Sequence, residues 1–189
     1  MIELLRSTPT NLTSDYTLVF AHGAGAPMDS VFMERVTEAI ALAGIEVVRF
    51  EFPYMQERRA TGKKRPPDRA PKLLASFVEV IEACGGFNRC VLAGKSMGGR
   101  MATMLAAENV VPATVVFGYP FHPQGKMDKP RIEHLQSITS PITILQGERD
   151  PLGKPEEVAA YSLSTAVEVI WMEDGDHDLT PRKKKIKSL

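Results

Sequence analysis

The sequence predicts an α/β fold, in which a mostly parallel sheet of about six to eight strands lies between two layers of helices. Short apolar runs alternate along the chain with segments of helical periodicity. The apolar runs are continuous rather than alternating, which is typical of strands buried on both faces of a sheet. Strands separated by helices favour right-handed parallel crossovers. Together these observations predict a three-layer sandwich.

In the first half of the chain, β-branched and aromatic residues predict a strand over 17–21. Apolar residues at helical spacing then predict a helix over 29–43, and a second apolar run predicts a strand over 45–50. The segment 51–70, rich in Arg, Lys and Pro, is expected to be a long loop. A helix with one apolar face is predicted to follow over 71–84.

The second half of the chain repeats this alternation. Continuous apolar runs predict the remaining strands, over 90–93, 114–117, 142–145 and 167–171. Helical spacing predicts helices over 97–108 and 155–162. Ligands bind such sheets beyond the carboxyl ends of the strands. We therefore expect functional residues in the loops that follow strands.

Length and composition are typical of one globular domain. The chain has 189 residues, within the roughly 100–200 residues of a domain. We assign residues 1–180 to a single domain and expect the basic tail 181–189 to be disordered. Acidic and basic residues balance at 23 each, so we expect no nucleic-acid partner.

Features of export and membrane insertion are missing from the sequence. No apolar run approaches the ~20 residues that span a bilayer, so we expect no membrane association. Residues 1–6 do not resemble the apolar core of a signal peptide. Two cysteines, Cys84 and Cys90, do not make a disulfide framework. We expect both thiols to be reduced in a cytoplasmic protein.

The strongest motif is Gly94-Lys95-Ser96-Met97-Gly98, between the strand predicted over 90–93 and the helix over 97–108. Gly-x-Ser-x-Gly at a strand-to-helix corner is the nucleophile-elbow pattern. The turn is so sharp that Gly94 and Gly98 need the small size of glycine. The alternative is a purely structural role, in which Ser96 is an ordinary helix N-cap. A phosphate-binding P-loop is disfavoured because Arg89 stands where that motif needs glycine.

Three other loops after strands carry polar residues. His22-Gly23-Ala24-Gly25-Ala26 follows the strand over 17–21. Asp150 follows the strand over 142–145, and His177 follows the last strand. Ser96, Asp150 and His177 thus occur in the order nucleophile, acid, histidine, which is the order in α/β hydrolases.

With these four motifs, the chain resembles the α/β-hydrolase superfamily in its small form without a lid domain. It is most similar to dienelactone-hydrolase-like proteins and predicted α/β hydrolases of unknown substrate. The motifs extend from about residue 16 to residue 178. The resemblance implies the α/β-hydrolase fold and a serine hydrolase that cleaves an ester, thioester or related acyl bond. Such a carboxylesterase or thioesterase-like enzyme would act on a small-molecule acyl substrate, with no metal and no organic cofactor.

The residue types suit this chemistry. A serine hydroxyl is a poor nucleophile at neutral pH, and an imidazole must take its proton as it attacks. We assign that step to His177 acting on Ser96, with Asp150 holding the imidazole tautomer. Attack would form a covalent acyl-enzyme and an oxyanion. The backbone N–H groups of Met97 and Ala24 are expected to receive that oxyanion.

Several carboxylates compete with Asp150 for the role of acid. They crowd His177 or adjoin Asp150, and they are Asp174, Asp176, Asp178 and Glu148. An acid after the preceding strand can point at the imidazole, whereas direct neighbours of a histidine on a loop seldom do. We therefore favour Asp150.

The other histidines and the basic residues are expected mainly in structural or surface roles. His22 is expected to hydrogen-bond to the glycine loop and shape it. His122 and His134 are expected at the surface, although His122 can also border the pocket. Lys95 is expected at the surface or the pocket rim. The basic residues 57–72 form either a solvated loop or a guide for an anionic acyl substrate.

The chain departs from the superfamily pattern after His177. Only twelve residues follow, and this segment is basic with little apolar character, so the usual closing helix is expected to be absent or very short. One sheet face would then be partly uncovered and could take a protein partner or a second copy of the chain. No inserted cap separates 114–117 from 142–145, so the pocket should be open. The alternative function is a hydrolase-fold scaffold or interaction protein with little turnover.

Overall fold

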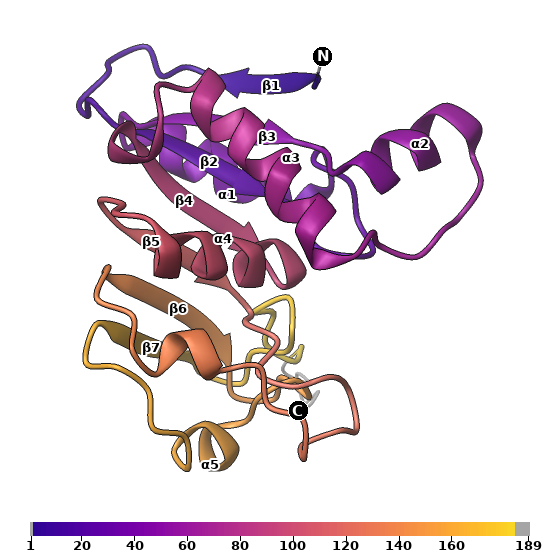
Figure 1. Ribbon diagram of the computed structural model, residues 1–189, viewed down its shortest axis with the longest axis vertical. Coiled ribbons are helices and arrows are strands. Elements are labelled where there is room, and N and C mark those ends of the chain that lie inside the picture. The colour runs from indigo at the N-terminus through magenta and orange to yellow at the C-terminus, as the bar shows by residue number, and fades with distance from the viewer. Residues whose placement is uncertain (1, 184–189) are drawn as a thin grey trace, which may run out of the picture.

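A computed structural model describes residues 2–183 of the protein and contains one seven-stranded sheet with helices on both faces (Figure 1). The strands lie in the order β1-β3-β2-β4-β5-β6-β7. Only β1 is antiparallel to its neighbour, β3. The strands are β1 (Leu4–Ser7), β2 (Thr17–Ala21), β3 (Glu46–Phe50), β4 (Cys90–Lys95), β5 (Thr114–Phe117), β6 (Ile142–Gly147) and β7 (Val167–Met172). This architecture confirms the predicted fold class.

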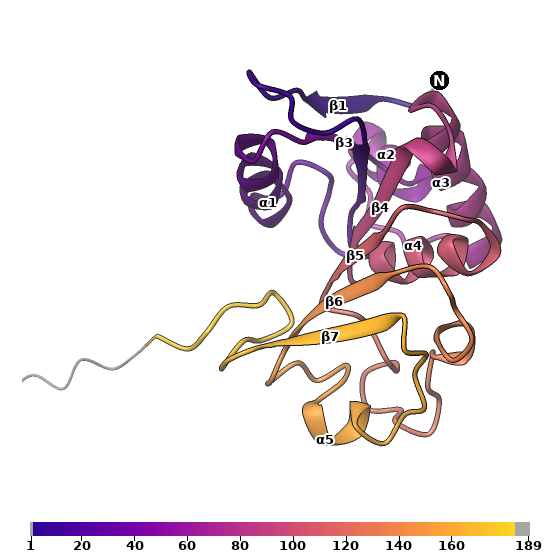
Figure 2. The same ribbon diagram turned by 90° about the vertical axis from the view of Figure 1, so that its left-hand side faces the viewer.

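The helices lie on the two faces unequally (Figure 2). They are α1 (Val31–Leu42), α2 (Pro53–Thr61), α3 (Ala70–Ala83), α4 (Met97–Glu108) and α5 (Pro155–Val158), with short 3-10 turns η1 (Phe87–Arg89) and η2 (Glu133–Leu135). On one face α1 packs over a small apolar cluster that includes Phe20, Met33 and Phe117. On the other, α3 and α4 cover the larger core, which includes Phe77 and Met101.

Among residues 2–183, no helix covers part of the α1 face of the sheet. The half-buried side chains of Val115 and Leu145 lie on this face of β5 and β6, and Ile170 of β7 is 41% exposed. Within the described chain, no helix follows β7. The expected uncovered face is therefore present, centred on β5, β6 and β7.

Three elements differ from the sequence-based expectation. The strand β1 was not expected, because it is short and only half-buried. Residues 53–61 form α2 rather than a loop, since Pro53 starts the helix and Gly62, at φ 70°, ends it. Only Tyr54 and Met55 of this helix are buried, so it carries almost no apolar periodicity. The helix α5 ends at Val158, earlier than the predicted 162.

The basic tail 181–189 was expected to be disordered, and the structure describes its first three residues, 181–183. Pro181 forms an isolated β-bridge with Gly175. The Arg182 guanidinium donates a 2.8 Å hydrogen bond to Asp174. Residues 184–189 lie outside the described part of the chain. Among the helices of residues 2–183, none has the length and apolar character needed to cross a bilayer.

The corner between β4 and α4 requires glycine on both sides of Ser96. A Cβ on Gly94 would overlap with the backbone of Gly98 and Gly99. A Cβ on Gly98 would overlap with the backbone of Ala21 and His22. The start of α4 thus lies directly against β4 and the end of β2, which fixes where Ser96 leaves the sheet.

We predict that Gly94→Ala lowers the free energy of unfolding by about 1–3 kcal/mol, the usual cost of overpacking. Gly25→Ala is the matched control, because nothing lies within 4 Å of a Cβ there. Its stability should be unchanged or slightly higher, since alanine restricts the unfolded chain. Urea denaturation of both variants measures the difference. Equal stabilities would contradict the tight corner.

Candidate active site

Ser96 occupies the turn between β4 and α4 in a backbone conformation that serine rarely adopts. Its φ is 51° and its ψ is −114°. Positive φ costs a non-glycine residue free energy, and such strain is concentrated at functional sites. The turn places Ser96 beyond the carboxyl end of β4, at the edge where ligands bind in sheets of this kind.

The structure brings together the three residues proposed as nucleophile, base and acid. His177 Nε2 lies 2.9 Å from Ser96 Oγ. His177 Nδ1 lies 2.7 Å from Asp150 Oδ2. Asp150 follows β6 and His177 follows β7, so three different strands supply one chain of hydrogen bonds. The central imidazole is part-buried, whereas Asp150 is fully buried.

A buried hydrogen-bond network holds the Asp150 carboxylate. Its Oδ1 accepts a 2.9 Å bond from the backbone N–H of Leu152. Its Oδ2 accepts a 3.0 Å bond from the amide of Gln146, which also bonds the backbone of Tyr119. Gln146 was missed by sequence reasoning. A buried-type position near the end of β6 that carries an amide, four positions before the acid, was the available signal.

The four competing carboxylates make other contacts. Asp174 pairs with Arg182 and Arg149, and Glu148 accepts a bond from the Asp174 backbone N–H. Asp176 accepts bonds from the backbone of its own loop, at Asp178 and Thr180. The Asp178 side chain is 69% exposed. None of the four is hydrogen-bonded or ion-paired to the His177 ring, whose partners are Ser96 and Asp150.

Lys95 is buried and lines a cavity at Ser96, so the pocket alternative for this residue holds and the surface alternative is wrong. Its Nζ donates a 2.7 Å hydrogen bond to the backbone carbonyl of His177 and forms a 3.3 Å ion pair with Asp178. Burial lowers the pKa of this ammonium, and the charge of Asp178 opposes that shift. Lys95 therefore ties the loop after β7 to the end of β4.

The loop after β2 lies beside Ser96. Ala24 and Met97, the expected oxyanion donors, line the same cavity as Ser96. Met97 is the first residue of α4, where backbone N–H groups have no partner within the helix. The Tyr54 hydroxyl donates a 3.0 Å bond to the Ala24 carbonyl and braces the loop.

His22 holds the loop after β2 through hydrogen bonds, as its sequence position suggested. Its Nδ1 donates a 2.6 Å bond to the Gly23 carbonyl, and its Nε2 accepts a 3.1 Å bond from the Phe52 N–H. Burial lowers the pKa of His22, which favours this neutral tautomer.

Two other histidines are less exposed than expected. His122 is fully buried, lies 3.2 Å from Glu157 and lines the cavity beside Ser96. The pocket-border interpretation of His122 therefore holds and the surface interpretation is wrong. His134 is half-buried against Thr103, at 2.9 Å. Burial, together with the positive charge of Arg100, lowers the pKa of His134 to about 4.

Three of the seven basic residues of 57–72 pair with carboxylates, namely Arg59, Arg65 and Lys72. Arg59 pairs with Glu51 at 2.6 Å and with Asp29 at 2.8 Å. Arg65 pairs with Glu57 and also with Asp68. Arg58, Lys63, Lys64 and Arg69 form no ion pair among residues 2–183, so both interpretations of this segment stay predictions.

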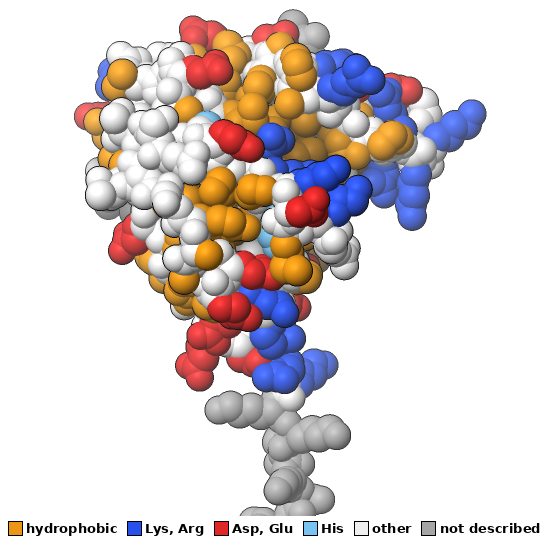
Figure 3. Space-filling model, turned by 60° about the horizontal axis from the view of Figure 1, so that its bottom comes forward, with side chains coloured by type: hydrophobic (Ala, Val, Ile, Leu, Met, Phe, Trp, Pro, Cys, Tyr) orange, Lys and Arg blue, Asp and Glu red, His pale blue; other side chains and the backbone are white. Residues whose placement is uncertain are grey.

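Two cavities meet at Ser96. One, of about 440 Å³, includes Met97, Arg100 and Arg131 in its lining. The other, of about 500 Å³, includes Phe32 and His177 in its lining. Figure 3 shows apolar side chains around a hollow, with Lys and Arg side chains gathered along one side. A substrate bound with its reacting bond at Ser96 could therefore place one part in each cavity.

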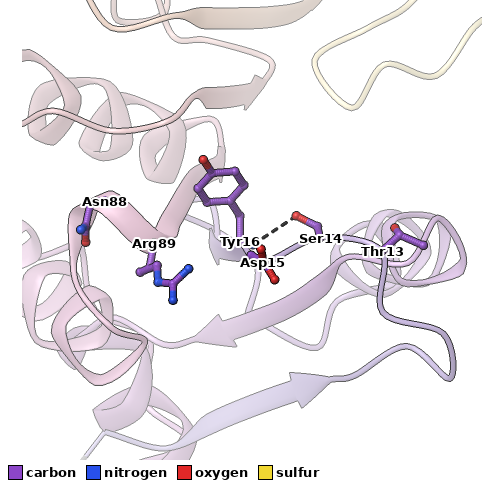
Figure 4. A pocket seen from close by; sticks show the side chains of 6 residues that line it. All are labelled: Thr13, Ser14, Asp15, Tyr16, Asn88 and Arg89. Atoms are coloured by element: carbon purple, nitrogen blue, oxygen red, sulfur yellow. Dashed lines mark hydrogen bonds between the residues drawn. The ribbon is translucent and has the colours of Figure 1, made fainter.

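A further hollow, of about 510 Å³, lies away from these residues (Figure 4). Tyr16 and Arg89, which line it, directly precede β2 and β4. It thus opens at the amino ends of the strands, opposite Ser96. Among residues 2–183, no group of three or more His, Cys, Asp or Glu side chains is placed to hold a metal ion.

Solved structures similar to the chain share its fold. An α/β serine hydrolase homologue from Coxiella burnetii has a TM-score of 0.73 at 21% identity, over 93% of this chain and 83% of that one. A lid-less α/β serine hydrolase from Xanthomonas campestris has a TM-score of 0.69 at 20% identity, over 94% and 81%. A monoacylglycerol lipase from Paleococcus ferrophilus has a TM-score of 0.71 at 14% identity, over 94% and 90%.

No curated protein sequence matches the chain. A family described as an alpha/beta hydrolase domain matches residues 14–189, which is most of this chain. With the sheet order, the corner at Ser96 and the structural neighbours, this match identifies the protein as a member of the α/β-hydrolase family.

Proposed function

We propose that the protein is a serine hydrolase that cleaves an ester, thioester or related acyl bond through Ser96, His177 and Asp150. The observation that carries the proposal is the unbroken chain of hydrogen bonds from Ser96 Oγ through the imidazole to a buried carboxylate, at 2.9 and 2.7 Å. Structural neighbours named as serine hydrolases and as a lipase support acyl-ester chemistry.

The hydrogen bonds assign one tautomer to the neutral imidazole of His177. Ionised Asp150 can only accept, so Nδ1 carries the proton that points to Oδ2. Nε2 then has a free lone pair and accepts the Ser96 hydroxyl proton. This tautomer is the one a general base needs, and the bonds from Leu152 and Gln146 hold the carboxylate in place.

Attack by Ser96 Oγ on an acyl carbonyl forms a carbon–oxygen bond and passes the hydroxyl proton to His177 Nε2. The negative oxygen of the tetrahedral intermediate lies beside the N–H groups of Ala24 and Met97. One such donor is typically worth about 2.7–4 kcal/mol of barrier. His177 then protonates the leaving group, and water hydrolyses the acyl-enzyme by the reverse sequence.

A fluorophosphonate probe tests Ser96 directly. Wild type should be labelled at this residue, and both Ser96→Ala and His177→Ala should lose labelling. Ser162→Ala is the matched control, because Ser162 is exposed and lines neither cavity at Ser96. Mass spectrometry of the labelled peptide identifies the modified residue. Labelling that survives Ser96→Ala would overturn the assignment, and a folded but unlabelled wild type would favour a scaffold with little turnover.

The choice of acid has its own test. Asp150→Asn should reduce kcat on a p-nitrophenyl ester by about 10⁴-fold, because an amide favours the wrong tautomer of the imidazole. Asp178→Asn, which alters an exposed carboxylate near His177, should change kcat only a few-fold. Steady-state rates of the two variants decide between these carboxylates. A larger loss from Asp178→Asn would contradict the role given to Asp150.

A further inference from the structure

The two cavities at Ser96 are not equivalent with respect to the proposed base. His177 lines the cavity that holds Phe32, and it does not line the cavity that holds Arg100 and Arg131. A general acid must lie within hydrogen-bond reach of the group it protonates. The leaving group therefore belongs in the cavity with His177. The acyl group, which stays on Ser96, extends into the cavity with the arginines.

Two guanidinium groups line this acyl cavity without carboxylate partners. No ion pair among residues 2–183 involves Arg100 or Arg131. Arg100 Nε is buried and has no hydrogen-bond partner. A buried donor that is left unsatisfied is costly, and more so when it is charged. The cavity is therefore lined by two guanidinium groups that no carboxylate of residues 2–183 pairs with.

The two positive charges also act on one another. Burial and then the charge of Arg100 lower the pKa of Arg131. The same charge contributes to the low pKa of His134, which is therefore neutral near pH 7 and does not add to the cluster. Like charges held together in a partly buried site repel, and a bound anion relieves that repulsion.

The other ionisable groups of this cavity have partners elsewhere. Asp68 lines the cavity, and its Oδ1 pairs with Arg65 at 2.9 Å and with Lys72 at 3.2 Å, while its Oδ2 is buried without a hydrogen-bond partner. His122 lies 3.2 Å from Glu157. Neither carboxylate bonds to Arg100 or Arg131, so the local excess of positive charge remains.

We propose that the acyl cavity binds acyl groups that carry a terminal carboxylate, held by Arg100 and Arg131. This inference rests on the proposed serine hydrolase function. The substrate is a half-ester or half-thioester of a short dicarboxylic acid. Arg100 lies four residues after Ser96 in α4, a rise of about 6 Å along the helix, which suits a short chain. Water is consumed, the acyl–oxygen or acyl–sulfur bond breaks, and a dicarboxylic acid and an alcohol or thiol are released.

The test compares two esters of equal chain length, monoethyl glutarate and ethyl pentanoate, with hydrolysis followed by NMR. Wild type should hydrolyse the half-ester with a kcat/KM at least about tenfold higher. Arg131→Gln and, separately, Arg100→Gln should lower kcat/KM for the half-ester by about 10- to 100-fold, the usual worth of a charged hydrogen bond. Both should change that for ethyl pentanoate less than about threefold. Arg35→Gln, an exposed arginine on α1, is the matched control and should leave both values unchanged.

A binding experiment separates this inference from the proposed function. Monoethyl glutarate is titrated calorimetrically into Ser96→Ala protein, which cannot turn it over. Its Kd should be at least about tenfold lower than that of the Ser96→Ala/Arg131→Gln double variant. If the probe labels Ser96 but the two esters react equally, the anion site is wrong and the hydrolase stands. If no ester reacts, this titration decides: absent binding, or binding indifferent to Arg131→Gln, overturns the anion site.

Discussion

The site depends on the close contact between β4 and α4 at Ser96. Gly94 and Gly98 let two backbones approach to a distance that no side chain would tolerate. The approach forces positive φ on Ser96 and lifts its hydroxyl off the sheet. Every other part of the site is placed relative to that hydroxyl. The glycine loop after β2 lies beside it, and the loops after β6 and β7 bring Asp150 and His177 to it.

Much of this arrangement could be predicted because its elements obey local rules. The buried strands are continuous apolar runs, and α4 begins where the elbow pattern requires. Ser96, Asp150 and His177 all follow strands whose carboxyl ends meet at one edge. Their contact needed only the parallel order of the sheet. The three-residue geometry itself, at 2.9 and 2.7 Å, comes from the structure alone.

The elements that were missed share a physical reason, because tertiary contacts decide them. The helix α2 buries only Tyr54 and Met55, too few for a periodic signal. Lys95 and His122 are polar residues buried by partners distant in sequence, the carbonyl of His177 and the carboxylate of Glu157. Net charge was also uninformative. The formal charge is zero, but it does not show how charge is distributed. Arg59 and Arg65 pair with carboxylates, whereas Arg100 and Arg131 form no ion pair among the described residues.

The uncovered half of the sheet makes the two ends of the site unequal in local stability. Ser96 follows β4, a central strand with helices over both its faces. His177 follows β7, which pairs only with β6 among the described strands. Regions with few apolar contacts open at lower free energy than the core. If β7 separated from β6 in a local unfolding event, the His177 imidazole would move away from Ser96 while the β4–α4 corner stayed folded. Backbone amides of β7 would then exchange with deuterium well before those of β4, and catalytic competence would be lost ahead of the fold itself.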